Sequence, residues 1–401
     1  MHTVCDMNAH EKHVELRRLL IAQVPADFSD WLDFVAIGAL LAYVWTVPTY
    51  VFAALGVAFG LPYLLVGPFA GVIVDRMSLN TVLVLSNLGR AVFTAALFLA
   101  PSWPVLLFLI ALRGSVDTFF TPAKQGAIQA LTNESNRMRA NGRSHAINQA
   151  SKIVAPALGG SLLIVLAPAQ IFLLNALASV IAAIMVWRLY PIARAASDDP
   201  EEPGMMQNIL AGLREINAKP ILKTALLMMA AGYFAMYFYD MLIVPMNRDL
   251  GFSETILGVT LAFVGAGGVL GSFMLGETKR PFVWIAAGLG VGGGLSITLG
   301  LFEATGTPIK LWVYLAIFFL LGVTSAIGLV PYRTLIQNHV GANRIGRVTA
   351  LSEAINTMAL LSAPFAGAVL AGATSMGVAF IGGGAMFLAI AGRAFLLRRA
   401  R

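Results

Sequence analysis

Charged residues and cysteines are scarce in this chain. Only 12% of its 401 residues are charged and 58% are hydrophobic, whereas a soluble domain carries about 25% charged residues. A chain this apolar does not stay soluble as a folded globule, so the composition predicts a polytopic membrane protein. The single cysteine, Cys5, excludes an internal disulfide and a cysteine-based metal site.

Signatures of catalysis and of cofactor binding are also missing from the sequence. There is no P-loop, no metal-spaced His or Cys cluster and no nucleophile–base arrangement. The glycine-rich stretches 265–271 and 290–294 lie within apolar segments and follow no strand, so they predict close helix packing instead of nucleotide binding. We expect no enzyme activity, no cofactor and no metal.

Nucleic acid is excluded as a partner by where the basic residues fall. The formal net charge is +7, but the Lys and Arg residues lie between apolar segments, which is the pattern of membrane topology. The loops of one side hold only Arg248 and Lys310. The positive-inside rule therefore places both termini in the cytoplasm, and we expect an integral protein of the bacterial cytoplasmic (inner) membrane.

Long apolar segments are abundant. A helix needs about 20 residues to cross ~30 Å of hydrocarbon, and open strands leave backbone groups unsatisfied in lipid. We expect an all-α membrane protein with about twelve transmembrane helices in two pseudo-symmetric six-helix bundles. The expected spans are 17–45, 48–74, 80–100, 103–123, 144–166, 169–190, 221–246, 255–276, 282–302, 310–332, 347–371 and 376–397.

An internal repeat supports the division into two bundles. The pattern of 146–159, Ala-Ile-Asn followed after seven residues by Pro-x-x-Gly, recurs at 354–367. The offset of about 208 residues is close to half the chain, which indicates a duplicated unit. Two parallel repeats are typical of transporters whose bundles rock about a site near the membrane midplane.

The expected domains follow from this repeat and from a polar break in the middle of the chain. Residues 195–204 are polar and helix-breaking. We expect an N-terminal six-helix bundle over 1–190, a cytoplasmic linker over 191–220 and a C-terminal six-helix bundle over 221–401.

Three acids stand inside the first expected span. An ionised carboxylate costs ~2.5–3.5 kcal/mol in mid-membrane, so Asp27, Asp30 and Asp33 must face water or a partner. Steps of three residues fan them over about 120° of a helix, which lets them line one wide cavity. Asp30 lies ~20 Å from the cytoplasmic end, near the midplane. With its counterpart Asp240 in the second repeat, Asp30 is the expected proton carrier; Asp33 is second, and Asp27 is expected to be a helix-end or vestibule acid.

The fourth expected span contains Arg113 with Asp117 one helical turn later. A charged residue in mid-membrane is functional by default, and residues at i and i+4 share a helix face. One interpretation is that Arg113 modulates the proton affinity of a carboxylate during transport. The alternative is a neutralised structural pair.

Aromatic residues are expected to line a substrate cavity. Tyr233 and Tyr237 lie on the seventh expected span among methionines, and such side chains form an adaptable surface for amphipathic ligands. We add Trp31 and Phe34 of the first span to this expected cavity. The alternative for any single Tyr is packing near the membrane interface.

The loop after the second span resembles a motif of the major facilitator superfamily. Gly71, Asp75 and Arg76 match its pattern of a Gly, three residues and Asp-Arg. The resemblance implies that Asp75 and Arg76 form a cytoplasmic gate by pairing across the two halves. Residues 77–80 lack the further basic residues of the family motif, which implies a gate with fewer charges. The alternative is an ordinary solvated turn.

A second motif resembles the antiporter motif of drug-exporting members of this superfamily. It comprises Pro156, Gly159 and Gly160, with Ala155 in place of the first Gly. Ser29-Asp30-Trp31 and Arg139-Ala-Asn141 further resemble the branch that holds the enterobactin exporter and macrolide efflux proteins. The resemblance implies a monomeric, proton-coupled exporter of amphipathic small molecules such as drugs or a siderophore. Uptake by proton symport is the alternative, and a non-transporting receptor or scaffold is a third hypothesis.

Overall fold

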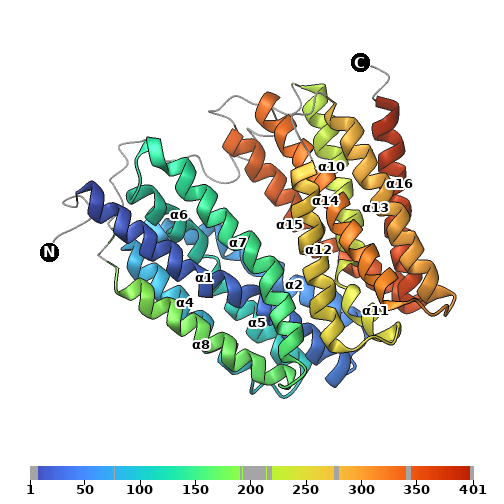
Figure 1. Cartoon of the computed structure of the whole chain (residues 1–401), viewed down its shortest axis with the longest axis horizontal. Helices are drawn as coiled ribbons and strands as arrows, with labels where there is room; N and C mark the ends of the chain where they lie inside the picture. The colour runs from blue at the N-terminus through green and yellow to red at the C-terminus, as the bar shows by residue number, and fades with distance from the viewer. Residues whose placement is uncertain are drawn as a thin grey trace. The chain divides into compact units, whose positions relative to one another are not determined.

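Helices are the only regular elements in the part of the chain that the structure describes (Figure 1). The structure is a computed structural model. It describes residues 8–75, 77–189, 192, 214, 219–274, 280–339 and 345–397.

The helices of the first half are interrupted at several points. They are α1 (Ala9–Ala39), the π-helix η2 (Leu40–Val44), α2 (Thr49–Leu65), α3 (Gly67–Asp75), α4 (Leu79–Leu97), α5 (Trp103–Asp117), α6 (Phe120–Ala130), α7 (Glu134–Leu162) and α8 (Pro168–Trp187).

The second half has fewer interruptions. Its helices are α10 (Pro220–Asp240), α11 (Ile243–Asp249), α12 (Glu254–Met274), α13 (Pro281–Ala304), α14 (Leu311–His339), α15 (Ile345–Ala373) and α16 (Met376–Leu397).

Helix starts follow local chemistry. Ser78 and Asn133 cap α4 and α7, because each side chain accepts a hydrogen bond from the backbone amide three residues later. Pro168, Pro220 and Pro281 begin α8, α10 and α13, where the missing amide hydrogen costs nothing and the fixed φ suits a helix.

Nine helical segments of the described chain are long and apolar enough to cross a membrane. They correspond to nine of the twelve expected spans. The other three fall on α1, on α2 with α3, and on α7; α2 is a shorter apolar helix. The acids Asp27, Asp30 and Asp33 lower the hydropathy of α1, and the first half of α7 is polar.

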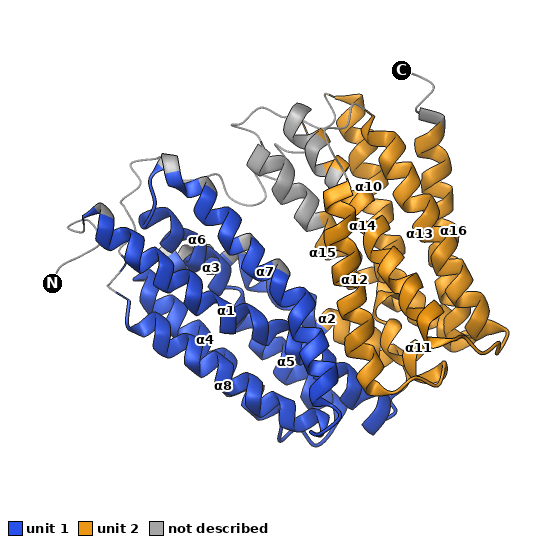
Figure 2. Cartoon of the chain, viewed as in Figure 1, with its two compact units in different colours: residues 1–47, 58–200 blue, residues 48–57, 201–401 orange. Residues whose placement is uncertain are grey.

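The contacts divide the chain into two compact units (Figure 2). Unit 1 comprises residues 1–47 and 58–200, and unit 2 comprises residues 48–57 and 201–401. The boundary at residue 200 falls within the linker expected at 191–220. Most of that linker lies outside the described residues.

The two units share a packing order. In unit 1, α4 packs against α5 and α8, and α1 packs against α7 and α8. In unit 2, α13 packs against α14 and α16, and α10 packs against α15 and α16. Helices at equivalent places in the sequence repeat therefore have equivalent neighbours.

Two glycines of the repeated pattern mark close helix approaches. A Cβ on Gly159 of α7 would lie 3.1 Å from Leu32 Cδ1 and 3.3 Å from Val35 Cβ of α1. A Cβ on Gly367 of α15 would overlap the backbone carbonyl of Phe238 on α10. Small residues let helix backbones approach closely in membranes, so each glycine sets the spacing between its helix and the first helix of its repeat.

We expect Gly367→Ala to destabilise the protein more than Gly159→Ala. Side chains can shift around a new methyl group at 159, whereas a backbone carbonyl blocks the one at 367. Overpacking typically costs about 1–3 kcal/mol, so Gly367→Ala should lower the free energy of unfolding by about 3 kcal/mol or more. Gly392→Ala is the control, because nothing lies within 4 Å of a Cβ there. Equal thermal unfolding temperatures for the 367 and 392 variants in detergent would contradict this prediction.

Candidate functional site

The three acids of α1 differ in their exposure. Asp27 is 2% and Asp33 is 0% exposed, whereas the side chain of Asp30 is 33% exposed. Each carboxylate contacts a cationic side chain of a neighbouring helix. Asp30 is the acid of this group that solvent reaches most readily.

Arg90 of α4 is the central cation of the site and is fully buried. Its guanidinium donates hydrogen bonds to the Ala26 carbonyl at 2.8 Å, to Ser29 Oγ at 3.0 Å and to the Asp30 carboxylate. A second guanidinium nitrogen lies 3.4 Å from Asp117. One arginine therefore joins α1, α4 and α5.

The prediction from sequence missed Arg90, although the signal was present. The residue lies in the middle of the expected span 80–100, and a mid-membrane arginine is a functional candidate. It also lies on the buried face of α4, in register with Asn87 and Thr94, both of which are fully buried. That polar register within an apolar helix marks the side that faces the site.

Arg113 of α5 bridges two acids of α1. Its guanidinium nitrogens lie 2.8 Å from Asp30 and 3.1 Å from Asp33. Asp117, the expected helical partner of Arg113, instead pairs with Arg90 and accepts a hydrogen bond from the Tyr63 hydroxyl at 2.8 Å. The i, i+4 spacing puts Arg113 and Asp117 on one face of α5. From that face Arg113 reaches the acids Asp30 and Asp33 of α1, and Asp117 reaches Arg90 of α4.

Asp27 is buried in the middle of α1, whereas we expected it to be a helix-end or vestibule acid. It accepts hydrogen bonds from Gln23 at 2.6 Å and Asn148 at 3.2 Å, and Lys124 Nζ lies 3.6 Å away. Ser144 Oγ donates to Gln23 at 2.8 Å. Gln23 lies one turn before Asp27 on α1, but Lys124, Ser144 and Asn148 come from α6 and α7, and helix periodicity alone could not assign them to the surroundings of Asp27.

A polar cavity of about 660 Å³ adjoins this end of the site. Its wall includes two partners of Asp27, Lys124 and Asn148, and several further polar side chains of α6 and α7. The lining residues are Thr121, Lys124, Gln125, Ile128, Gln129, Arg137, Asn141, Ser144 and Asn148.

The charges of this site do not balance when every group is ionised. Among the described side chains, four carboxylates face three cations, which leaves one excess negative charge. The carboxylates are those of Asp27, Asp30, Asp33 and Asp117, and the cations are Arg90, Arg113 and Lys124. An uncompensated charge is costly in a buried site, so one bound proton would neutralise the cluster, which we call the Asp–Arg network.

The aromatic residues expected near Asp30 form a cluster. The ring centroids of Trp31 and Phe34 are 6.3 Å apart, and those of Phe34 and Phe59 are 6.0 Å apart. Lys152 Nζ lies 5.4 Å from the Trp31 ring centroid. These rings lie within unit 1 and pack beside the helix that carries the acids.

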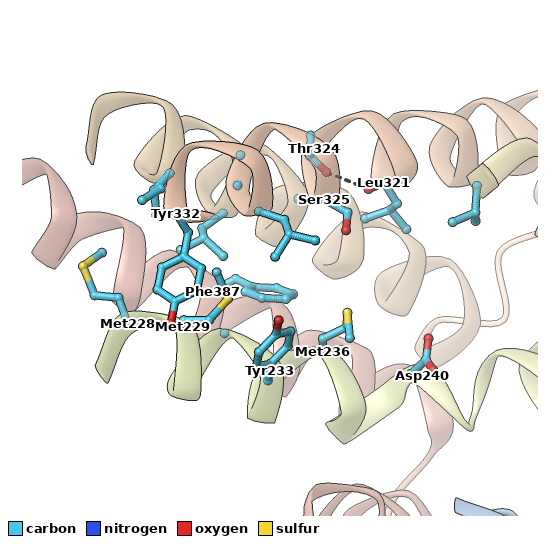
Figure 3. A pocket seen from close by; sticks show the side chains of 18 of the residues that line it. Met228, Met229, Tyr233, Met236, Asp240, Leu321, Thr324, Ser325, Tyr332 and Phe387 are labelled. Atoms are coloured by element: carbon cyan, nitrogen blue, oxygen red, sulfur yellow. Dashed lines mark hydrogen bonds between the residues drawn. The ribbon is translucent and has the colours of Figure 1, made fainter. Parts of the chain in front are cut away.

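Unit 2 contains an apolar cavity of about 270 Å³ (Figure 3). Met229, Tyr233, Met236 and Asp240 line it from one face of α10, and Figure 3 shows the last three on the side of α10 that faces α14. Tyr237 instead donates a hydrogen bond to Asn356 at 3.0 Å.

That hydrogen bond has an equivalent in unit 1. Asn148 of α7 donates to Asp27 of α1, and Asn356 of α15 accepts from Tyr237 of α10. Tyr237 follows Asp27 by 210 residues and Asn356 follows Asn148 by 208. The repeated asparagine therefore ties the fifth expected span of each half to the first.

The two motifs of the family resemblance lie on α3 and α7. Pro156, Gly159 and Gly160 are buried on α7, where Gly159 approaches α1. Gly71 and Asp75 lie on α3 with side chains that the structure does not describe, and Arg76 lies outside the described residues. The gate stays a prediction.

Comparisons with known proteins place these features in a family. The profile described as Major Facilitator Superfamily matches residues 19–364. YfiS, an MFS-type transporter of Bacillus subtilis (strain 168), is 27% identical over 385 residues, which cover 94% of this chain and 91% of YfiS. Macrolide efflux protein A of Enterococcus faecalis is 27% identical over 322 residues, which cover 75% of this chain and 94% of that protein.

Solved transporter structures share the fold. A bacterial homologue of the human lysosomal transporter Spinster, in an inward-facing and unoccupied conformation, matches with a TM-score of 0.72 at 17% identity and covers 97% of both chains. The nucleoside transporter NupG matches with a TM-score of 0.72 at 11% identity, covering 95% of this chain and 99% of its own. With a family profile matched over most of its length, this chain is an integral membrane transporter of the major facilitator superfamily.

Proposed function

We propose that this transporter exports amphipathic small molecules from the bacterial cytoplasm in exchange for protons, by alternating access. The observation that carries the proposal is the Asp–Arg network, in which four carboxylates face three cations inside unit 1. A site with one excess negative charge takes up one proton at little electrostatic cost, because the proton restores neutrality.

Asp30 is the proposed proton carrier of this network. It is more exposed than Asp27 and Asp33, and both Arg90 and Arg113 contact its carboxylate. Protonation of Asp30 weakens both ion pairs together, and with them the contacts of α1 to α4 and α5. A proton at this position therefore changes the packing of three helices, which is the link that coupling of protons to a conformational change requires.

Export is the proposed direction because of the relatives and of the cavity in unit 2. Macrolide efflux protein A aligns over three quarters of this chain, and the buried Pro156 region resembles the antiporter motif. The apolar cavity beside Tyr233 suits the apolar part of an amphipathic molecule. The cytoplasmic position of both termini, the gate at Asp75 and Arg76, and the monomeric state belong to the same proposal.

Everted membrane vesicles test both direction and coupling. Vesicles containing the transporter and energised by respiration should accumulate radiolabelled erythromycin and the fluorescent cation ethidium. Nigericin, which dissipates the pH gradient, should reduce accumulation at least about tenfold. Vesicles from the same strain without the transporter are the control. Accumulation that persists without a pH gradient and without a membrane potential would overturn the coupling, and depletion from everted vesicles would favour uptake.

A further inference from the structure

Asp240 is the acid in unit 2 that lines the apolar cavity, and it stands without a counter-charge there. Among the residues that the structure describes, none forms a hydrogen bond or an ion pair with its side chain. Among the described residues of the cavity wall there is no Lys, Arg or His. This differs from unit 1, where Asp27, Asp30 and Asp33 of α1 each contact a cationic side chain.

The backbone is interrupted beside this carboxylate. Helix α10 ends at Asp240, and α11 begins at Ile243, within the helical segment 220–249. The C-terminus of α10 carries a partial negative charge and the N-terminus of α11 carries a partial positive charge, so the two helix ends largely offset each other. The carboxylate of Asp240 is therefore the negative charge that attracts a cation to this point.

The remaining wall of the cavity is mostly apolar and polarisable, with a few hydroxyl groups such as those of Thr324 and Ser325. Met228, Met229 and Met236 contribute thioethers, and Tyr233 and Phe387 contribute rings. Figure 3 shows Asp240 at one end of this lining, beyond Met236 and away from Met228 and Tyr332. A ligand with a single positive charge at one end and an apolar body would match this distribution.

We propose that the cavity of unit 2 binds monocationic amphipathic molecules, with Asp240 as the counter-charge of the ligand. The substrate class is that of hydrophobic amines and quaternary ammonium or phosphonium ions. This inference rests on the proposed function, because it names the substrate class of the exporter. It moves Asp240 from proton coupling, its role in our sequence prediction, to substrate recognition.

The charge arrangement also assigns proton coupling to unit 1 and substrate recognition to unit 2. In unit 1, cations hold the acids, and one proton balances the network. In unit 2, no cationic side chain of the described lining balances Asp240. A cationic ligand would therefore provide Asp240 with the positive counter-charge that Arg90 and Arg113 provide for Asp30.

Binding of tetraphenylphosphonium to the purified transporter in nanodiscs tests the proposal without transport or a proton gradient. Asp240→Asn should weaken tetraphenylphosphonium binding at least about tenfold, equivalent to about 1.4 kcal/mol. It should leave binding of triphenylphosphine oxide, a neutral molecule with three of the same rings, within about twofold. Isothermal titration calorimetry measures both ligands, with empty nanodiscs as the blank.

Asp249→Asn is the matched control. It removes the same charge from the same unit, but Asp249 pairs with Arg248 at 2.9 Å and does not line the cavity. It should leave the binding of both ligands unchanged. Ser325→Trp, which adds bulk to the cavity wall from α14, should weaken both ligands and confirm that they occupy the cavity.

Two outcomes would overturn the inference: unchanged tetraphenylphosphonium binding in Asp240→Asn, or equal loss of the cation and the neutral ligand. Neither outcome would contradict the proposed function, because that function is tested separately by the dependence of efflux on the pH gradient. Conversely, a wild-type protein that binds tetraphenylphosphonium through Asp240 but moves ethidium without regard to the pH gradient would leave the inference standing and defeat the proton coupling.

Discussion

Asp30→Asn is expected to abolish proton-driven transport and to leave substrate exchange intact. Asparagine keeps an oxygen that accepts hydrogen bonds from Arg90 and Arg113 but cannot bind and release a proton in the functional range. The exchange of one substrate molecule for another requires no net proton movement. We therefore expect gradient-driven accumulation to fall at least about a hundredfold while exchange stays within about threefold.

Reconstituted vesicles separate the two activities. Accumulation of radiolabelled erythromycin is measured under an imposed pH gradient, and exchange is measured against unlabelled erythromycin with no gradient. Asp33→Asn is the informative comparison, because Asp33 pairs with Arg113 but is fully buried. If Asp30→Asn keeps full proton-driven transport and Asp33→Asn loses it, the order of the two acids is reversed. Loss of both activities in Asp30→Asn would indicate a structural role.

Arg90→Met should be the most destabilising single substitution in the Asp–Arg network. The guanidinium is fully buried and joins the Ala26 carbonyl, Ser29, Asp30 and Asp117. Its removal takes away the ion-pair partner of Asp117 and leaves Asp30 with Arg113 alone, and it raises the excess of negative charge. Breaking a buried pair on one side typically costs about 3–5 kcal/mol. We expect a correspondingly lower unfolding temperature in detergent and a smaller monodisperse fraction on size-exclusion chromatography.

A second substitution shows whether charge imbalance causes the loss. Asp117→Asn in the Arg90→Met background removes the carboxylate that lost its ion-pair partner, so part of the lost stability should return. Coupling energies for residues in contact are about 0.5–3 kcal/mol. Arg90→Lys should rescue little, because one ammonium group cannot reach partners that a planar guanidinium spans.

Arg188→Met is the control for this series. Arg188 is exposed at the end of α8, and surface substitutions usually change stability by less than about 0.5 kcal/mol. Equal unfolding temperatures for Arg90→Met and Arg188→Met would contradict the assigned role of Arg90. Additive effects of the Arg90 and Asp117 substitutions would show that the two residues do not interact energetically.

The helical architecture was predictable from sequence because its causes are local. A membrane span needs a continuous apolar stretch of sufficient length, and hydropathy along the chain reports that directly. The same reasoning identified the acids of α1, since a carboxylate in an apolar segment is conspicuous. It also located Arg113. Arg90 was predictable by the same rule, because it is an arginine in the middle of an apolar segment.

The partners of these residues were not predictable, because they depend on how helices pack. Periodicity placed Asp117 beside Arg113 on one helix face, but in three dimensions each pairs with a different helix. Asp27 was expected to be a helix-end or vestibule acid; it lies in the middle of α1 and contacts residues of α6 and α7. The repeat predicted that Asn148 and Asn356 occupy equivalent places, and packing decided that one donates to an acid while the other accepts from a tyrosine.

The sequence by itself determined that this protein is a helical membrane transporter with ionisable groups in its first span and a duplicated plan. The tertiary structure decided which acid faces which cation, that the Asp–Arg network has one excess negative charge, and that Asp240 lines a cavity whose described wall has no cation. The physical reason is the sequence distance over which each effect operates. Hydropathy and helix periodicity depend on residues that are close together in the chain. The charge balance of a site depends on side chains that are far apart in the chain and that only helix packing brings together.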